Sequence, residues 1–356
     1  MKPGQRNLPG NASAPLGQEA ARGTGERDLI AAIRARVPAA PPWLIVGIGD
    51  DAAVVTPERG ALELLTTDAL VEGIHFDRRF STARDIGWKA LAVNLSDVAA
   101  MGGTPRLALL SLGLPANSVL EDVHALVDGF LALAANARVT LAGGNITRSP
   151  GPLTVDVTVT GFARARHVLT RGGGHAGDDL YVTGAVGAAA AGLRWLSEGT
   201  PSHGPRDMME LPGIDECVRR HCAPEPRVRI GALLGRNRAA SACMDLSDGL
   251  ADAVRQLAAA SRTGATIDAA ALPIPAAARE CFRRAGVDPV AGAAAGGDDY
   301  ELLFAAPRRA RGRLATVIRQ ARGVPITRIG RLTKEPETAI VRNGVPEPLP
   351  PGFVHF

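Results

Sequence analysis

The sequence predicts two domains that each combine helices and strands, of the α/β or α+β class. The chain has 356 residues, and domains of about 100–200 residues are usual, so the length favours two of them. A fresh series of strands and helices begins with the apolar segment 179–182, and each half carries strands and helices of its own. We therefore expect a first domain over 26–165 and a second over 166–356.

The first half begins with a segment that differs from the rest. Residues 1–25 are rich in Gly, Pro, Asn, Ala and Gln and lack periodicity, which predicts a disordered tail. A capping-box pattern at Thr82-x-x-Asp85 predicts a helix that runs to about Met101 and stops at Gly102-Gly103. Further helices are expected at 28–37 and 121–136. Strands are expected at 43–46, 52–56, 62–67, 106–112, 139–142 and 153–162.

The second half mixes both element types. Helices are expected at 185–197, 227–236, 247–260 and 308–320. Strands are expected at 179–182, 243–246, 265–268, 300–305 and 325–331. Residues 198–225 carry Gly, Pro and charge, and we interpret them as a surface insertion.

Composition argues against several classes of protein. The net charge is +4, but 37 of the 40 basic residues are Arg scattered along the chain, and aromatic residues make up only 4%. Bases therefore lack stacking platforms, and we expect no nucleic-acid partner. No apolar run approaches the roughly 18 residues of a membrane span, and the N-terminus lacks a signal pattern. We expect a cytoplasmic enzyme that does not bind membranes.

The four cysteines do not predict a disulfide framework or a zinc site. Cys217 and Cys222 flank His221, but no CxxC pair occurs in the chain, and a structural zinc needs four suitably spaced ligands. We interpret these residues as partly buried thiols beside an exposed histidine.

The most informative feature is a set of Asp residues placed next to Gly at the ends of apolar strands or the starts of helices. The set is Gly49-Asp50-Asp51, Thr66-Thr67-Asp68, Asn94-Leu95-Ser96-Asp97, Asp245-Leu246-Ser247-Asp248-Gly249 and Gly296-Gly297-Asp298-Asp299. Clustered carboxylates repel one another unless a cation neutralises them, and Mg²⁺ is commonly held by a few carboxylates, phosphates and water. Nearby hydroxyls add neutral oxygens, and glycines let backbone N–H groups approach phosphate. The set predicts a magnesium–nucleotide site.

The alternative is that each Asp caps a helix or a turn. Asp245 could cap a helix that begins near Ser247. Asp97 is harder to explain in this way, because it lies inside a predicted helix, one turn after Asn94 and on the same face.

Common nucleotide motifs are absent or fail in context. Gly47-x-Gly49-x-x-Ala52, with Asp68 about 20 residues on, matches a dinucleotide fingerprint. That fold needs a helix directly after the glycines, whereas the following residues are β-like and are soon interrupted by Pro57 and Gly60. The chain has no P-loop, and Lys89 lacks protein-kinase context.

Longer motifs resemble those of thiamine-monophosphate kinases over nearly all of residues 27–356. They are GIGDDAAVV (47–55), TTDALVEGIHF (66–76), KALAVNLSDVAAMGGTPR (89–106), LAGGN (141–145), LTRGGGHAGDDLYVTG (169–184), MDLSDGLADA (244–253), GGDDYELLF (296–304) and GFVHF (352–356). The resemblance implies the fold of aminoimidazole ribonucleotide synthetase, with an N-terminal α/β and a C-terminal α+β domain. It also implies a homodimer with the nucleotide near the subunit interface, and transfer of a phosphoryl group from ATP to thiamine monophosphate with several Mg²⁺ ions.

The resemblance implies roles for individual residues. The residues that match Mg²⁺ sites are Asp51, Thr66, Thr67, Asp68, Asp97, Asn145, Asp245 and Asp248. The residues that match ATP contacts are Thr67, Gly144, Asn145, Arg171 and Ser247. His75 and Asp298 match substrate contacts, and Phe353 is the candidate aromatic against the substrate rings. Asp97, Asp68 and Arg171 are the expected catalytic groups.

This sequence departs from the family pattern at two of these positions. Asn145 stands where Asp is usual and offers an oxygen without charge, and Asp298 stands where Glu is common and reaches one methylene less far. Two alternatives stay open. One is another ATP-using enzyme of the same fold, resembling aminoimidazole ribonucleotide synthetase or selenophosphate synthetase, and the other is a non-catalytic nucleotide-binding homologue.

Overall fold

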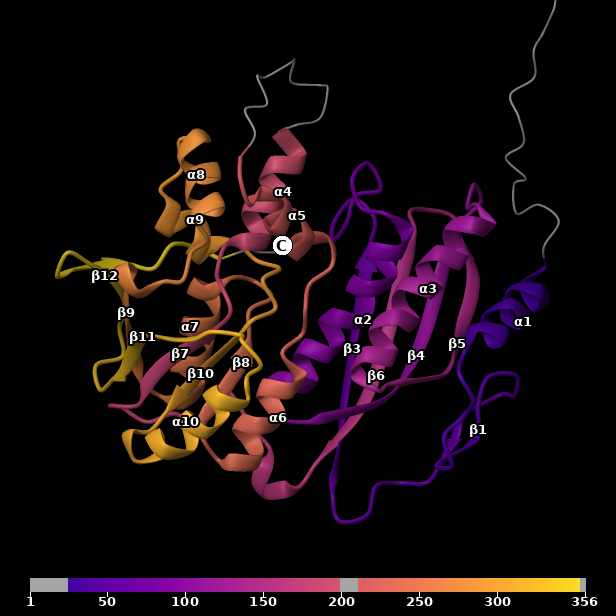
Figure 1. The fold of residues 1–356 in the computed structure, drawn as a ribbon, viewed down its shortest axis with the longest axis horizontal. Coiled ribbons are helices and arrows are strands. Elements are labelled where there is room, and N and C mark those ends of the chain that lie inside the picture. The colour runs from indigo at the N-terminus through magenta and orange to yellow at the C-terminus, as the bar shows by residue number, and fades with distance from the viewer. Residues whose placement is uncertain (1–24, 199–210, 353–356) are drawn as a thin grey trace, which may run out of the picture.

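The computed structural model describes residues 25–198 and 211–352. Most of the predicted tail, residues 1–24, and the C-terminal Phe353 lie outside the described residues. Two sheets, one of four strands and one of seven, lie side by side with helices between and around them (Figure 1).

A four-stranded sheet of mixed direction organises the first half, in the order β3-β6-β4-β5. Only the β4–β5 pair is parallel. Its strands are β3 (Leu62–Val71), β4 (Thr104–Pro115), β5 (Thr140–Ser149) and β6 (Thr154–Ala163). A small ribbon of β1 (Leu44–Val46) and β2 (Val54–Val55) and the helix α1 (Glu26–Arg36) lie beside β5 (Figure 1).

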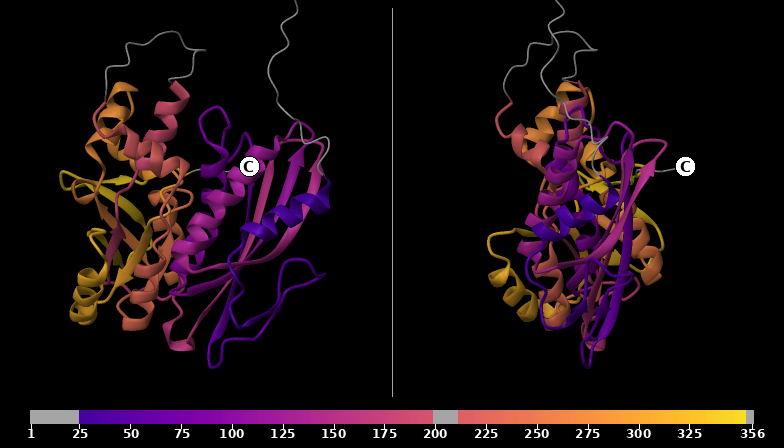
Figure 2. Two further views of the ribbon diagram at one scale, coloured as in Figure 1. Left: turned by 45° about the vertical axis from the view of Figure 1, so that its right-hand side comes forward. Right: turned by 90° about the vertical axis from the view of Figure 1, so that its right-hand side faces the viewer.

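Two long helices, α2 (Ala83–Ala100) and α3 (Leu120–Ala137), cover one face of this sheet (Figure 2). The predicted capping box is confirmed, because the Thr82 hydroxyl accepts a hydrogen bond from the Asp85 N–H and the Asp85 carboxylate accepts one from the Thr82 N–H. α2 and α3 cross closely at two glycines: a Cβ on Gly87 would lie 1.8 Å from the Leu126 carbonyl oxygen, and one on Gly129 would lie 1.9 Å from that of Arg84. α2 is buried nearly all round, as expected of a helix enclosed by protein.

A seven-stranded sheet organises the second half, in the order β13-β12-β9-β11-β7-β10-β8, with β12–β9 as its one parallel pair. Its strands are β7 (Asp179–Thr183), β8 (Ala242–Asp245), β9 (Gly264–Asp268), β10 (Leu302–Ala306), β11 (Ile326–Thr333), β12 (Thr338–Arg342) and β13 (Val345–Pro348). The helices are α4 (Ala188–Glu198), α5 (Ile214–Cys222), α6 (Val228–Asn237), α7 (Leu250–Ser261), α8 (Ala276–Arg284), α9 (Pro289–Ala295) and α10 (Arg311–Gln320). Short 3₁₀ turns are η2 (Ala165–His167), η4 (Ala269–Ala271) and η5 (Arg308–Ala310). Apolar cores lie on both faces of this sheet, one including α4, α7, α8 and α9, the other α6 and α10.

Several expectations are corrected. The proposed insertion at 198–225 contains α5, whose Cys217 and Cys222 are buried, and His221, expected to be exposed, is only 3% exposed. The predicted strands 62–67 and 139–142 are longer, so Thr66-Thr67-Asp68 and Gly143-Gly144-Asn145 lie within β3 and β5 rather than in loops. Strand pairing continues through these polar residues, which sequence periodicity alone does not reveal.

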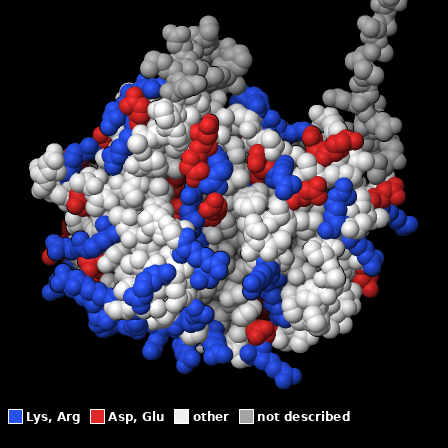
Figure 3. Space-filling view, viewed as in Figure 1, with Lys and Arg blue, Asp and Glu red and all other residues white. Residues whose placement is uncertain are grey.

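The surface carries its positive charge unevenly. In the view of Figure 3, Lys and Arg side chains gather along the lower left, over the second half. In the sequence, residues 302–334 contain eight Arg and one Lys but no Asp or Glu, so the expected scatter of Arg does not hold there. No helix in the described part of the chain is long and apolar enough to cross a bilayer.

Candidate active site

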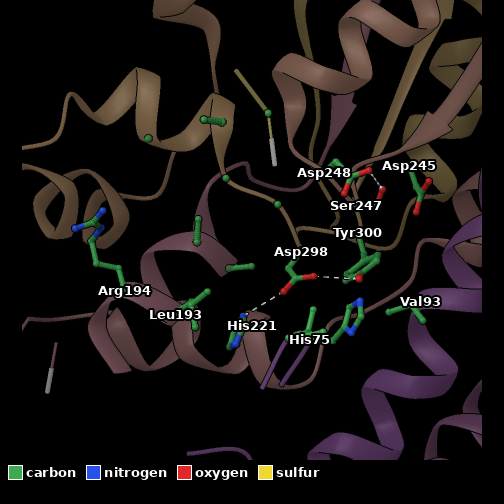
Figure 4. A pocket seen from close by; sticks show the side chains of 18 of the residues that line it. His75, Val93, Leu193, Arg194, His221, Asp245, Ser247, Asp248, Asp298 and Tyr300 are labelled. Carbon is green, nitrogen blue, oxygen red and sulfur yellow. Dashed lines mark hydrogen bonds and ion pairs between the residues drawn. The ribbon is translucent and has the colours of Figure 1, made fainter. Parts of the chain in front are cut away.

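Residues from both halves line one cavity of about 1030 Å³. Eight predicted site residues line it: Asp68, His75, Asp97, Arg171, Asp245, Ser247, Asp248 and Asp298. Asp68 lies on β3 and Asp97 on α2. His75 follows β3, and Arg171 precedes β7. Asp245 ends β8, Ser247 and Asp248 follow it, and Asp298 precedes β10. In Figure 4, Asp245 and Asp248 lie at one side of the view, Leu193 and Arg194 at the other, and Asp298 between them.

Carboxylates dominate one end of this cavity, and Asp68 on β3 shows the effect most clearly. Burial, followed by the charges of Asp97, Asp245, Asp156 and Asp248, raises the pKa of Asp68 to about 7. Each negative neighbour makes ionisation of the next one less favourable. This end of the cavity therefore favours a cation.

Asp97 and Asp245 are held by hydroxyl groups. The Thr66 hydroxyl donates to Asp97 Oδ2, and the Ser96 hydroxyl donates to Asp245 Oδ2 over 2.7 Å. Burial raises the pKa of Asp97, and burial followed by the charge of Asp97 raises that of Asp245 to about 6. Asp245 ends β8, and α7 begins only at Leu250, so Asp245 is not the helix cap that its sequence position allowed.

The loop after β8 presents Ser247 and Asp248, whose side chains are 3.3 Å apart. Gly249 ends this loop with φ of 97°, and a Cβ there would lie 2.8 Å from the Ala295 carbonyl oxygen, so glycine is required. Arg171 also lines the cavity, and its Nη1 donates to Gln256 Oε1 over 2.6 Å. A positive group thus stands beside the carboxylates.

His75 and Asp298 lie farther along the cavity. The Val71 N–H donates to His75 Nδ1 over 3.1 Å, which closes a turn and leaves Nε2 as the protonated nitrogen of the neutral ring. Asp298 accepts from Lys89 Nζ over 2.9 Å and from the Tyr300 hydroxyl over 3.1 Å. The sequence interpretation missed the roles of Lys89, Tyr300 and His221, although Tyr300 belongs to the GGDDY motif and Lys89 is the one lysine in residues 3–333.

The far end of the cavity is mostly apolar. It is lined by Leu193 of α4, Phe282 of α8, Val287 and Ala291, together with Arg194. An acidic end joined to an apolar end suits a ligand that carries phosphate at one end and rings at the other.

Other predicted residues lie away from this cavity. Side chains alternate along a strand, so Thr66 faces Asp97 whereas Thr67 points to the opposite face of the sheet, 3.2 Å from Thr158 Oγ1. Asn145 lies on that same outer face, in register with Ser111, on the opposite edge strand from Asp68. Gly144 is on the same strand, Asp51 is exposed between β1 and β2, and Phe353 lies outside the described residues.

The carboxylates suit a hard divalent cation, although they do not form a complete metal site by themselves. No three His, Cys, Asp or Glu side chains within 25–198 and 211–352 converge to hold a metal ion. Mg²⁺ usually completes its shell with water and substrate phosphate, which an incomplete carboxylate set allows. Burial and the neighbouring carboxylates raise the pKa of Asp68, so a cation bound among them would favour its ionised form.

Comparisons with known proteins agree with this geometry. Residues 49–163 match the family model "AIR synthase related protein, N-terminal domain", and residues 175–343 match the C-terminal domain of the same family. The thiamine-monophosphate kinase of Escherichia coli (strain K12) is 39% identical over 339 residues, covering 93% of this chain and 98% of that protein.

Two solved structures are similar in fold and sequence. The thiamine-monophosphate kinase from Stenotrophomonas maltophilia K279a has a TM-score of 0.76 and 37% identity, covering 88% of this chain and 94% of that one. The structure described as AaThiL complexed with AMPPCP and TMP has a TM-score of 0.73 and 29% identity, covering 97% and 100%.

Proposed function

This chain belongs to the AIR synthase-related proteins and, among them, to the thiamine-monophosphate kinases, and we propose that its acidic cavity is the place of phosphoryl transfer. The chain phosphorylates thiamine monophosphate with ATP, giving thiamine diphosphate and ADP. The observation that carries the assignment of the site is that one cavity is lined by four carboxylates together with Arg171, His75 and Asp298.

The transfer needs no covalent enzyme intermediate. An oxygen of the acceptor phosphate forms a bond to the γ-phosphorus of ATP, and the bond from that phosphorus to its bridging oxygen breaks, releasing ADP. The acceptor is already mostly dianionic at neutral pH, because the second pKa of a phosphate monoester is about 6, so no general base is required. The protein must therefore bring two polyanions together and offset their repulsion.

Asp68, Asp97, Asp245 and Asp248 would hold Mg²⁺, and Arg171 would add positive charge from the protein. When bound, Mg²⁺ supplies charge neutralisation at the phosphates. Thr66 fixes Asp97 through its hydroxyl, and Ser96 fixes Asp245, so both carboxylates are oriented before ligands arrive. His75 would donate from Nε2 to the acceptor phosphate, and Asp298 would contact the same substrate.

Magnesium binding is expected to weaken as the pH falls through about 7. Asp68 and Asp245, with pKa values of about 7 and 6 in the metal-free protein, must lose their protons when the metal binds. The stability of the metal-free fold depends on pH in the opposite direction. Because the pKa of Asp68 rises from 3.8 in the unfolded chain to about 7 in the folded protein, the metal-free protein should lose stability as the pH rises across that range.

Titration calorimetry with Mg²⁺ and a non-hydrolysable ATP analogue, in buffers of different ionisation enthalpy, checks this expectation. Proton release should be larger at pH about 6 than at about 8, and Asp68→Asn should reduce it. Equal proton release at both pH values would contradict the assignment of Asp68 to the metal.

We also propose that the protein is a homodimer. The sheet face opposite α2 and α3 exposes Leu65 (72%) and Leu109 (36%), and the outlying residues Thr67 and Asn145 share this face. A second copy packed there would cover the leucines and bring Asn145 of one copy near the other. Light scattering should give twice the monomer mass, and Leu65→Arg should halve it; a wild-type monomer would refute this proposal.

Three further expectations stay predictions: a domain boundary near residue 165, a cytoplasmic location, and no binding to nucleic acid or membranes. The four-stranded sheet ends at Ala163 and the seven-stranded sheet begins at Asp179, which supports the boundary.

The assignment is tested by identifying the products. Incubation of the full chain with MgATP and thiamine monophosphate should yield thiamine diphosphate and ADP in equal amounts by chromatography. The selenophosphate synthetase alternative lacks support, because that enzyme class usually carries a reactive Cys in an N-terminal loop, whereas the first Cys here is Cys217, which is buried.

A further inference from the structure

Lys89 is a buried ammonium group that joins two segments of the cavity wall. Its side chain is 3% exposed. Its Nζ donates to the His75 carbonyl oxygen over 3.0 Å and to Asp298 Oδ2 over 2.9 Å. A buried charge is costly unless it is paired and hydrogen-bonded, and here the partners are the main chain of one substrate-facing residue and the side chain of another.

Asp298 is held in a conformation that its backbone does not favour. Its φ is 68°, and Tyr300 two residues later has φ of 48°; both values lie in the left-handed region that non-glycine residues seldom adopt. The Asp298 N–H donates to the Ser247 carbonyl oxygen over 2.8 Å, and the Tyr300 N–H donates to that of Leu246 over 3.0 Å. Such strain persists only where the surroundings fix it, and it gathers at functional sites.

Lys89 is the charged partner of the Asp298 carboxylate. His221 Nδ1 lies 3.5 Å from Asp298 Oδ2, but burial, followed by the charge of Lys89, lowers the pKa of His221 to about 4, so the imidazole is neutral near pH 7. Burial acts to raise the pKa of Asp298, but the Lys89 ammonium, together with His221 and the Tyr300 hydroxyl, lowers it below its usual range. Among the described residues, Lys89 and His221 are the basic side chains within 4 Å of the Asp298 carboxylate, and of these only Lys89 is charged near pH 7. Lys89 is thus the group that keeps a charged carboxylate facing the cavity, where Asp298 is 31% exposed (Figure 4).

Helix α2 connects this group to the acidic end. Lys89, Val93 and Asp97 are spaced by four residues and share one face of the helix. Eight residues of α-helix span about 12 Å, so α2 sets the separation between the Lys89 cluster and the Asp97 cluster. Lys89 can therefore fix where the substrate lies relative to the carboxylates at which its phosphate must react.

We propose that Lys89 is a positioning residue for the thiamine-phosphate acceptor, which ties the His75 turn to the Asp298 carboxylate so that both face the substrate together. The inference rests on the proposed function and extends it to a residue that does not itself need to touch the substrate. Lys89 acts on the acceptor, not on ATP, because its partners His75 and Asp298 lie outside the acidic end formed by Asp68, Asp97, Asp245 and Asp248.

The test compares steady-state constants of Lys89→Met, Lys89→Arg and the matched surface variant Lys334→Met. We expect Lys89→Met to lower kcat/KM for thiamine monophosphate about 10-fold or more, mainly through KM, as a displaced contact does. The KM for ATP should not change. Lys89→Arg retains the charge and should recover part of the loss, whereas Lys334→Met should match the wild type because Lys334 is exposed.

Loss of the buried ammonium leaves the Asp298 carboxylate without its cationic partner and could prevent folding, so the double variant Lys89→Met/Asp298→Asn is included. It removes the unpaired charge and should fold, yet keep the raised KM for thiamine monophosphate. Unchanged KM in both Met variants, or an equal rise in the KM for ATP and for thiamine monophosphate, would overturn the inference. The wild-type assay distinguishes failure of the proposed function from failure of the inference about Lys89. If the wild type shows no thiamine monophosphate-dependent ADP release, the proposed function fails and the inference fails with it.

Discussion

Replacing Asp97 with Asn is expected to lower kcat at least about 10²-fold, by analogy with removal of one preorganised group that stabilises a transition state. Asp97 lies on the buried helix α2, accepts from the Thr66 hydroxyl, and lines the cavity with Asp68 and Asp245. Asn has the same shape but no charge, so the fold should persist while the charge that balances the metal is lost. Single-turnover measurement of ADP formation at saturating ATP checks the effect on chemistry.

Asp128→Asn on α3 is the matched control, because Asp128 pairs with Arg36 at the surface and lies outside the cavity. It should leave kcat unchanged. Near-normal turnover by Asp97→Asn, with the same thermal midpoint as the wild type, would rule out Asp97 as a metal-binding catalytic group.

Replacing Glu301 with Gln is expected to lower the free energy of unfolding by about 3–5 kcal/mol, the usual cost of breaking a buried ion pair. The Glu301 side chain is 2% exposed and accepts from Arg227 Nε over 2.6 Å and from Thr183 Oγ1 over 2.7 Å. These contacts join the beginning of β10 to the end of β7 and to the residue before α6. Gln would remove the buried countercharge of the Arg227 guanidinium and leave it only the more exposed Glu225, 3.3 Å away.

Urea unfolding followed by circular dichroism gives the midpoint for each variant. Glu280→Gln is the control, since Glu280 pairs with Arg283 and Arg284 on the surface of α8 and should keep the wild-type midpoint. The double variant Glu301→Gln/Arg227→Met removes both charges and should recover part of the loss. A Glu301→Gln midpoint equal to that of Glu280→Gln would show that the pair does not stabilise the fold.

Local sequence signals predicted part of the fold well, because they depend on neighbouring residues. The Thr82–Asp85 capping box and the Gly102-Gly103 stop bound α2 correctly, to within about two residues. α5 was missed because Gly, Pro and charge around it suggested a loop. Ile214, Cys217 and His221 nevertheless recur at helical spacing and are buried, so the periodic signal was present.

The candidate site, like the fold, contains features that the sequence predicts and features that it does not. The family motifs indicated the residues that line the acidic end, since each motif is local. The Lys89–Asp298 contact joins residues 209 positions apart, and no sequence pattern in a single chain reveals such a pair. The alternation of side chains along β3 could have separated Thr66 from Thr67, because adjacent strand residues face opposite sides.

The rate of ADP release by the full chain with MgATP, measured with and without thiamine monophosphate, shows directly whether the protein is a thiamine-monophosphate kinase. We predict rapid release with the acceptor, little without it, and one thiamine diphosphate formed for each ADP. If ADP release is absent, or proceeds at the same rate without thiamine monophosphate, the protein does not use thiamine monophosphate as its phosphoryl acceptor.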